Sequence, residues 1–120
     1  MRSRLLIVDD NPQFLDAAKD LLERQGLDVV AVASTGTEAL RRAAEVRPDC
    51  ILIDVDLGNE SGIELAGHFD GDHSPPVVLI SAYGETEFAD LIATSSAVGF
   101  ICKAELSAHK LAEVLDAANR

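Results

Sequence analysis

The sequence predicts an α/β fold in which five parallel strands form one doubly wound sheet with helices on both of its faces. Two observations support this prediction. Five short runs are apolar throughout and rich in β-branched residues, a pattern typical of strands buried on both faces of a parallel sheet. Segments with the apolar spacing of amphipathic helices lie between these runs, so strands and helices alternate along the chain. The runs are residues 5–8, 29–32, 51–53, 77–80 and 98–101.

Five helices are expected, one after each predicted strand, and local signals indicate where four of them begin. Two of these signals combine a Ser or Thr with a Glu three residues later, which together form a capping box. Another is an Asn followed by Pro, a residue favoured at the first helical position. In chain order, helices are expected to start at Asn11-Pro12, at Thr35-x-x-Glu38, near Ser61-x-x-Glu64 and at Ser107, with the first ending at Gly26 and the second at Pro48, while the fourth helix is expected from its apolar residues alone.

Each helix is expected to turn its apolar residues toward the sheet, because residues three or four apart share one face of a helix. In chain order these residues are Phe14, Leu15, Ala18, Leu21 and Leu22, then Leu40, Ala43 and Ala44, then Ile63, Ala66 and Phe69, then Phe88, Leu91 and Ile92, and finally Leu111, Val114, Leu115 and Ala118. Residues 70–76 form the one clear loop insertion in the sequence.

Length and composition predict a single domain. At 120 residues, of which 48% are hydrophobic, the chain fits one compact domain (residues 1–120) with one core. No apolar run is long enough to cross a bilayer, and the apolar residues 5–8 are too few for the core of a signal peptide. We therefore expect a cytoplasmic protein without membrane contact.

The charge balance disfavours nucleic acid as a partner of this domain. Ten Lys and Arg residues stand against 21 Asp and Glu residues, which gives a net charge of −11. Binding to phosphate backbones depends on Lys and Arg neutralising charge, so such a chain repels them in general. Cys50 and Cys102 lie in apolar stretches, and we expect small core residues in a reducing compartment rather than reactive thiols.

Polar residues follow four of the five predicted strands. In an open parallel sheet, ligands bind beyond the carboxyl ends of the strands where the strand order reverses. In the flavodoxin-like order 2-1-3-4-5, which we predict here, that place lies between strands 1 and 3. Asp9 and Asp10 follow the first strand, Asp54 the third, Ser81 the fourth and Lys103 the fifth. These side chains are therefore expected at one edge of the sheet.

This set of side chains indicates phosphoryl chemistry. Three converging carboxylates repel one another unless a cation joins them, and Mg²⁺ prefers a few carboxylates together with water and phosphate oxygens. Lys103 adds a point charge on a flexible stem that suits a phosphoryl oxygen, and Ser81 adds a hydroxyl donor. The arrangement favours Asp54 as a carboxylate nucleophile that forms an aspartyl phosphate.

The chain resembles the receiver domain of bacterial two-component response regulators over essentially its whole length. The segments that carry the resemblance are Val8-Asp9-Asp10, Asp54-Val55-Asp56-Leu57 with Gly62, Ser81-Ala82, and Gly99-Phe100-Ile101-Cys102-Lys103. Each segment alone is a weak signal, but all of them occur in order and at the ends of predicted strands.

The resemblance implies a role for each matching residue. Asp54 would be the phosphoacceptor, and Lys103 would pair with the phosphate. Asp10 would bind Mg²⁺ directly, Asp9 would bind it largely through water, and the backbone carbonyl of Asp56 would complete the protein ligands. In the switch, Ser81 would turn its hydroxyl toward the phosphoryl group, and the ring of Phe100 would repack in response.

Three positions depart from the family pattern. Gly58 stands where a Pro is usual, four residues after the acceptor, and Ala104 replaces the Pro that usually follows the lysine with a cis peptide bond. Since a cis bond without Pro is expensive, the Lys103–Ala104 bond is expected to be trans. Phe100 replaces a frequent Tyr and lacks its hydroxyl. None of these changes removes an atom from the phosphoryl transfer.

The resemblance also implies the partners. A sensor histidine kinase or a small phosphodonor would phosphorylate Asp54. Phosphorylation would shift the balance between two existing conformations of the surface formed by the fourth helix, fifth strand and fifth helix. The same surface could serve as a homodimer interface. The protein would be no enzyme beyond catalysing its own phosphorylation and dephosphorylation. A role in transcription regulation would require an effector domain beyond residue 120, so the chain could be a piece of a longer regulator.

Two other functions remain open from the sequence. Asp54-Val55-Asp56 also matches the D-x-D motif of Mg²⁺-dependent phosphohydrolases, although the chain has little room for a cap over a substrate. A receiver that docks to partners without phosphorylation is disfavoured, because no member of the acid, Ser and Lys set is missing. Tyr83 is expected either at the site entrance or on a surface turn. His68, His73 and His109 share no metal-ligand spacing.

Overall fold

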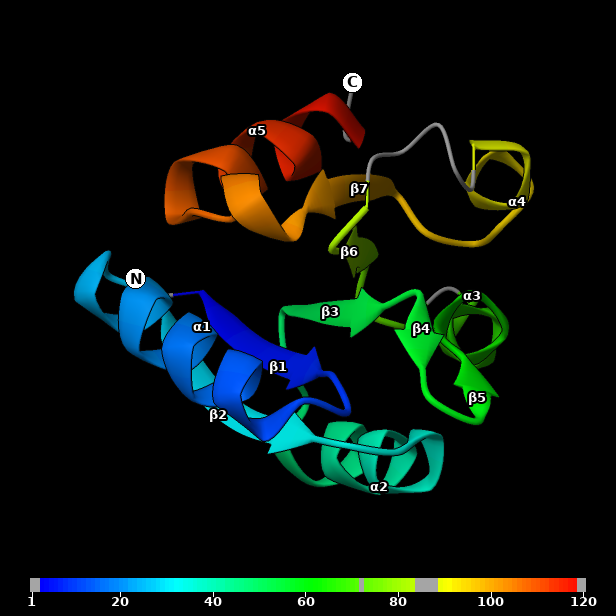
Figure 1. Ribbon diagram of the computed structural model, residues 1–120, viewed down its shortest axis with the longest axis horizontal. Coiled ribbons are helices and arrows are strands. Elements are labelled where there is room, and N and C mark those ends of the chain that lie inside the picture. The colour runs from blue at the N-terminus through cyan, green and yellow to red at the C-terminus, as the bar shows by residue number, and fades with distance from the viewer. Residues whose placement is uncertain (1–2, 72, 84–88, 119–120) are drawn as a thin grey trace.

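Five parallel strands form the main sheet of the protein (Figure 1). The computed structural model describes residues 3–71, 73–83 and 89–118. The strands are β1 (Arg4–Val8), β2 (Asp28–Ala33), β3 (Cys50–Asp54), β6 (Val77–Ser81) and β7 (Gly99–Cys102), and they lie in the order β2-β1-β3-β6-β7. Counted along the main sheet this is the order 2-1-3-4-5, so the predicted fold is confirmed.

Helices cover both faces of the sheet (Figure 1). The α-helices are α1 (Pro12–Arg24), α2 (Gly36–Val46), α3 (Gly62–Ala66), α4 (Ala89–Ala93) and α5 (Ala108–Ala118), and short 3₁₀ helices span Gly67–Phe69 and Lys103–Glu105. Residues from α1 and α5 pack on one face, and residues from α2, α3 and α4 pack on the other.

Two apolar layers hold the sheet between the helices. Successive side chains of a strand point to opposite faces, so each strand contributes to both layers. In β3, Ile51 and Ile53 face α2 and α3, whereas Cys50 and Leu52 face α1 and α5. Because each of these four residues is at most 1% exposed, the central strand has no solvent-facing side. That explains why the predicted strands read as continuous apolar runs.

The helix starts match the sequence signals. The side chain of Asn11 accepts hydrogen bonds from the backbone of the first turn of α1, and the side chains of Thr35 and Ser61 cap α2 and α3. In the predicted Thr35–Glu38 capping box, the Thr35 hydroxyl accepts the Glu38 N–H at 3.1 Å. The Glu38 carboxylate, however, accepts the N–H of Ser34 instead of that of Thr35.

Several residues expected in the core are exposed. Ala39 and Ala43 of α2 face the sheet, and this orientation turns the neighbouring Leu40 and Ala44 outward, since adjacent helical residues lie about 100° apart. In α4, likewise, Ile92 is buried and the adjacent Leu91 is exposed, whereas both were predicted to face the core. Leu21 and Ala118 are also exposed, whereas Phe88 lies outside the described residues.

A two-stranded hairpin interrupts the connection between β3 and α3 and was not predicted. It pairs β4 (Asp56–Leu57) with β5 (Glu60–Ser61) in antiparallel fashion, with Gly58 at a positive φ of 75° in the turn. Glu60 ties this hairpin to another element, because its carboxylate accepts the backbone N–H of Gly36 at the start of α2. The hairpin therefore bridges the end of β3 and the N-terminus of α2.

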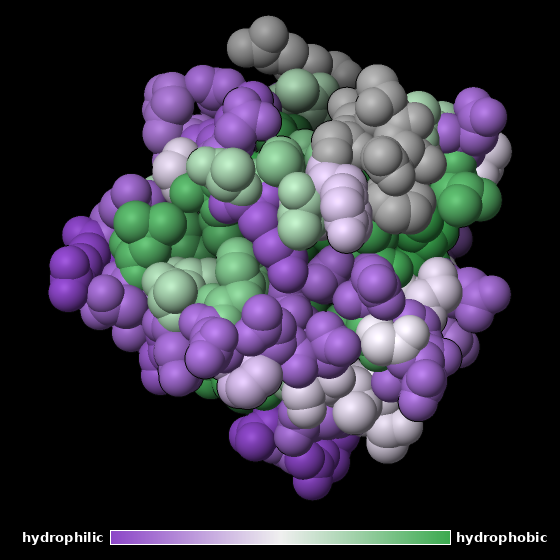
Figure 2. Space-filling view, in the orientation of Figure 1, coloured by the Kyte–Doolittle hydropathy of each residue, from purple (hydrophilic) through white to green (hydrophobic). Residues whose placement is uncertain are grey.

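One face of the molecule is mostly hydrophilic. Figure 2 shows hydrophilic residues over most of the face seen there, with smaller hydrophobic areas among them. Among the described residues, no helix combines the length and hydrophobicity needed to span a bilayer.

Gly62 allows the chain to pass close to the end of β3. Its N–H donates to the carbonyl of Val55 at 2.9 Å, and a Cβ at this position would overlap the backbone carbonyl oxygen of Asp54. A side chain at residue 62 would thus displace either β3 or the start of α3. The glycine is needed for space, since its φ is not in the left-handed region.

We expect Gly62→Ala to lower the free energy of unfolding by about 3 kcal/mol, because overpacking against backbone cannot relax easily. Urea denaturation followed by circular dichroism would measure the loss. Gly67→Ala is the matched control, since Gly67 has a helical φ of −64° and open space around its Cβ position. Equal unfolding free energies for the two variants would contradict this account.

Candidate functional site

The ends of adjacent strands bring the predicted site residues together. Asp54 and Ser81 are the last residues of β3 and β6, and Asp9 and Lys103 directly follow β1 and β7. The strands β1, β3, β6 and β7 are neighbours in the sheet, so all four residues lie at its carboxyl edge. The sequence-predicted convergence of these positions is confirmed by the geometry.

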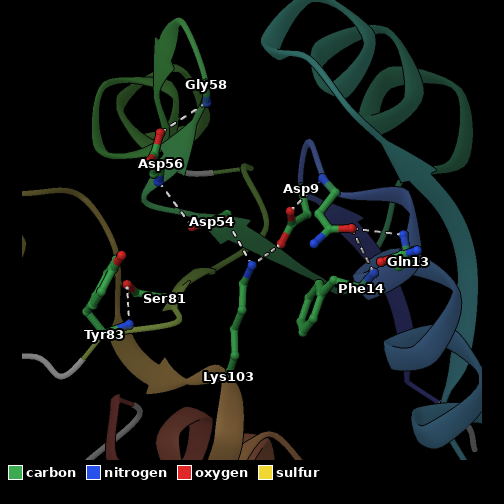
Figure 3. A network of polar contacts seen from close by, with 10 residues as sticks. Asp9, Gln13, Phe14, Asp54, Asp56, Gly58, Ser81, Tyr83 and Lys103 are labelled. Atoms are coloured by element: carbon green, nitrogen blue, oxygen red, sulfur yellow. Dashed lines mark hydrogen bonds and ion pairs between the residues drawn. The ribbon is translucent and has the colours of Figure 1, made fainter.

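Lys103 forms ion pairs with two buried carboxylates (Figure 3). Its Nζ lies 2.6 Å from Asp9 Oδ2 and 2.9 Å from Asp54 Oδ2. The Asp9 side chain is fully buried, and those of Asp54 and Lys103 are 9% and 17% exposed. Removing ions from water is costly, so such groups persist in a protein only when they are paired.

Backbone N–H groups hold the second oxygen of each carboxylate. Asp9 Oδ1 accepts the N–H of Asn11 at 2.9 Å, and Asp54 Oδ1 accepts the N–H of Asp56 at 3.0 Å. In both residues, therefore, one oxygen is held by the following loop and the other by Lys103. This pattern orients the two side chains before any ligand arrives.

The environment shifts the pKa values of the central pair. Burial raises the pKa of the Asp54 carboxyl, and the hydrogen bond from Lys103 offsets part of this rise. Burial by itself would lower the pKa of Lys103, but its hydrogen bonds to Asp9 and Asp54 outweigh that effect, and its pKa is raised. Lys103 therefore stays a cation at neutral pH.

Three carboxylates could hold a metal ion. Asp9, Asp10 and Asp54 each offer an oxygen, and these atoms lie within 4.8 Å of one another. Asp10 is exposed, which leaves the cluster open on one side. A set of two or three carboxylates with room for water fits Mg²⁺, which keeps several of its waters. The donor set and the open side thus both fit the expected ion.

A small cavity of about 180 Å³ adjoins these carboxylates. Its lining residues are Asp9, Asp10, Asn11, Asp54, Val55, Asp56, Ser81, Ala82, Tyr83 and Lys103. A hollow of about 350 Å³ lies elsewhere, between α2, α3 and the β4–β5 turn. Although that hollow is larger, every predicted side chain of the acid, Ser and Lys set borders the smaller one.

Ser81 is linked to the loop that follows β6. Its hydroxyl oxygen accepts the N–H of Tyr83 at 3.0 Å, while its hydroxyl hydrogen can still be donated (Figure 3). Ser81 is 1% exposed and Tyr83 is 62% exposed. Tyr83 therefore lies at the mouth of the cavity, one of the two positions considered from the sequence.

Other predicted residues have the expected surroundings. The side chain of Asp56 is exposed, and its Oδ1 accepts the N–H of Gly58 at 3.0 Å, so this carboxylate shapes the hairpin turn. Phe100 is half-buried and packs against the apolar layer of α2, α3 and α4. Among the described residues no peptide bond is cis, which confirms a trans bond between Lys103 and Ala104.

The sequence assigned the histidines and the cysteines no role in the site. The three histidines are exposed. Both cysteines are free, and burial raises the pKa of the Cys50 thiol to about 12, so it remains protonated. Cys50 is thus a core residue, as the sequence predicted, whereas Cys102 is only partly buried and not the core residue expected.

Sequence reasoning missed one neighbour of Lys103. It placed Phe14 among the core residues of the first helix, but the ring is only half-buried and lies under Lys103 Nζ, 4.2 Å from the ammonium. One signal could have found it. A residue in the first turn of the helix after Asp9 must lie near the same edge of the sheet.

The sequence matches the family model of the response regulator receiver domain over residues 5–116. It is similar to the transcriptional regulatory protein KdpE of Mycobacterium tuberculosis, with 42% identity over 78 residues. It is also similar to the DNA-binding response regulator MtrA of Mycolicibacterium smegmatis, with 33% identity over 103 residues. These matches cover 65% and 86% of this chain, but only 34% and 45% of the two relatives.

Solved structures agree with these matches. The signal receiver domain of the response regulator NarL from Mycobacterium tuberculosis superposes with a TM-score of 0.82 at 28% identity. The alignment covers 98% of this chain and 97% of that domain. The similarity therefore extends over the whole fold described above.

The raised pKa of Asp54 predicts a pH dependence of stability. A carboxyl whose pKa is higher in the folded than in the unfolded chain contributes stability below its unfolded pKa, and this contribution is lost as the pH rises through the folded pKa. We expect Asp54→Asn, which cannot ionise, to be more stable than the parent at neutral pH without divalent cations. This advantage should disappear in acid.

Urea denaturation at a series of pH values in the presence of a chelator would measure this difference. The exposed Asp16→Asn on α1 serves as the control and should show no such trend. A stability difference between Asp54→Asn and the parent that is constant with pH would show that burial does not disfavour the ionised carboxylate.

Proposed function

Because this chain belongs to the response regulator receiver domain family, we propose that it is a phosphorylation-controlled switch in which Asp54 accepts the phosphoryl group. One observation carries the proposal. A single ammonium group, that of Lys103, lies within 2.9 Å of both Asp9 and Asp54 at the carboxyl edge of the sheet. Beside it is a cavity large enough for a phosphoryl group.

Asp54 is the nucleophile of the proposed reaction. Its Oδ1 is held by the N–H of Asp56, and its Oδ2 points toward Lys103 and the cavity. A carboxylate oxygen forms the new bond to phosphorus, while the bond from phosphorus to the donor breaks and the donor keeps the electron pair. Burial raises the pKa of Asp54, and the hydrogen bond from Lys103 offsets part of this rise, which favours the ionised, nucleophilic form of the carboxyl group.

Asp9, Asp10 and Asp54, with the backbone carbonyl of Asp56, would hold Mg²⁺ in this site. When bound, the ion supplies positive charge to the equatorial phosphoryl oxygens and relieves the repulsion among the carboxylates. The clustering of three carboxylate oxygens within 4.8 Å supports this assignment. Asp9 is engaged on both oxygens, by Lys103 and by Asn11, which favours contact through water for that residue.

Lys103 and Ser81 would bind the transferred group. The Lys103 ammonium has three donors and is ion-paired with Asp9 and Asp54, and it can turn one donor to a phosphoryl oxygen. The Ser81 hydroxyl can donate its hydrogen to another oxygen of the same group. Both residues line the cavity beside Asp54.

The conformational response would begin at Ser81. If its hydroxyl turns toward the phosphoryl group, the hydrogen bond from the N–H of Tyr83 is lost, and the loop after β6 is released. Phe100 on the adjacent strand β7 is half-buried, and its ring would repack in response. The surface of α4, β7 and α5 would change as a result, as a shift between two existing populations.

The partners follow from the same proposal. A sensor histidine kinase would be the phosphodonor, and the chain would catalyse only its own phosphorylation and dephosphorylation. Residues 1–120 would form the receiver domain of a cytoplasmic protein. KdpE and MtrA are named as transcriptional or DNA-binding regulators and are longer than the matched segment, which supports a role in transcription through an additional domain.

Incubation with acetyl phosphate and Mg²⁺ should add the mass of one phosphoryl group, as measured by intact-protein mass spectrometry. Asp54→Asn should remove this adduct, because an amide oxygen is a poor nucleophile. Asp56→Asn is the matched control: it changes the same functional group two residues away, and we expect it to leave phosphorylation intact. An adduct that persists in Asp54→Asn would falsify Asp54 as the acceptor.

Isothermal titration calorimetry should show that Asp10→Asn weakens Mg²⁺ binding at least about tenfold, since even indirect metal contacts are worth that much. Asp16→Asn removes an equal charge from an exposed position on α1 and should leave the affinity nearly unchanged. Equal affinities for the two variants would mean that overall negative charge, rather than this cluster, attracts the ion.

A further inference from the structure

The Lys103 ammonium contacts an aromatic ring in addition to its two carboxylates. Its Nζ lies over the ring of Phe14, 4.2 Å from the centroid, and Figure 3 shows the ring beside the lysine stem. A cation within about 6 Å of a ring centroid on the face of the ring is attracted by its quadrupole. This contact is stronger where water is excluded, and the Lys103 side chain is only 17% exposed.

Hydrogen bonds fix the Phe14 backbone relative to the carboxylates. Asp9 Oδ1 accepts the N–H of Asn11 at 2.9 Å, and Asn11 Oδ1 accepts the N–H of Phe14 at 3.3 Å. Lys103 then connects the ring back to Asp9 Oδ2. The contacts among Asp9, Asn11, Phe14 and Lys103 thus close a ring of residues, and they hold the backbone that carries the Phe14 side chain at the start of α1.

The lysine needs a contact that is independent of the carboxylates. In the absence of other cations, Asp9 and Asp54 hold its ammonium. A divalent ion bound to the same oxygens would compete for them and would repel the ammonium. A flexible four-carbon stem would then be free to turn toward solvent, and its entropy would favour that.

An aromatic face suits this task for two reasons. It attracts a cation without adding net negative charge to a site that already has three carboxylates. It also occupies none of the three N–H donors in a conventional hydrogen bond, so they remain available for oxygen atoms. A carboxylate in the same place would bind both the metal and the ammonium.

We propose that Phe14 is a positioning residue, whose ring holds the Lys103 ammonium beside the carboxylate cluster so that its donors meet an incoming phosphoryl oxygen. The inference rests on the proposed function, since the phosphoryl group is the anion for which Lys103 is held. Phe14 itself touches no reacting atom. Its effect passes through Lys103.

The alternative is that Phe14 only fills space at the start of α1. Phe14→Leu separates the two roles, because leucine keeps an apolar side chain of similar bulk and loses the ring quadrupole. Phe14→Tyr is the matched control, since it keeps the ring face. If the ring only fills space, both variants should behave alike.

The first readout is the NMR signal of the Lys103 ε-methylene group in protein labelled with ¹³C-lysine and free of metal. Protons over a ring face are shifted upfield, so this signal should stand apart from those of Lys19 and Lys110, and Lys103→Arg would assign it. The shift should be lost in Phe14→Leu and kept in Phe14→Tyr. An unshifted signal in the parent chain would overturn the contact itself.

The second readout separates phosphorylation from metal binding. At saturating Mg²⁺, we expect Phe14→Leu to slow phosphorylation by acetyl phosphate about fivefold and Phe14→Tyr to slow it less than about twofold, in keeping with the strength of such contacts. The Mg²⁺ affinity of Phe14→Leu should not fall, because the ring holds a competing cation. A rate and an affinity that decline together would indicate a deformed site and would overturn the positioning role.

The two readouts distinguish this inference from the proposed function. If the parent chain takes up no phosphoryl group at all, the proposed function fails, and the ε-methylene shift still decides whether the ring holds the ammonium. If the parent is phosphorylated and Phe14→Leu keeps its full rate, the positioning role is wrong and the proposed function stands.

Discussion

The ion pairs between Lys103 and the carboxylates of Asp9 and Asp54 are the constraint on which the site depends. Two acids that are almost fully buried side by side would repel each other strongly, and burial alone raises the pKa of Asp54. The ammonium makes both charges tolerable at once. This arrangement requires β1, β3 and β7 to end at one edge of the sheet, and a parallel sheet whose strand order reverses between β1 and β3 provides such an edge. The strand order of the sheet therefore determines which charged side chains meet at the site.

The strands and the chemical groups at their ends could be predicted from the sequence because both depend on local patterns. A strand buried on two faces must be apolar at every position, and Leu5 to Val8 or Ile51 to Ile53 can be read directly. The face that each helix turns toward the sheet was harder to predict. Ala39 and Ala43 face the sheet in α2, but a pattern of small residues does not distinguish this face from the one containing Leu40. In such cases the packing against the neighbouring strands decides the orientation.

Contacts between distant segments account for what the sequence did not reveal. The β4–β5 hairpin depends on a glycine turn and on the bond from Gly36 to Glu60, a residue 24 positions away. The place of Phe14 beside Lys103 depends on the distance between α1 and the end of β7. No spacing rule links residues 14 and 103. The absence of Pro after Lys103, in contrast, was correctly expected to leave a trans bond, because that preference is a property of the peptide unit itself.

The position of Tyr83 has a practical consequence for studying this protein. It is the single tyrosine of a chain without tryptophan, and it lies at the mouth of the cavity with its N–H bonded to Ser81. The near-ultraviolet emission of the protein therefore comes almost entirely from one phenol next to the carboxylates. The unlabelled chain carries its own optical reporter, and quenching or recovery of its fluorescence would follow events at this loop in real time.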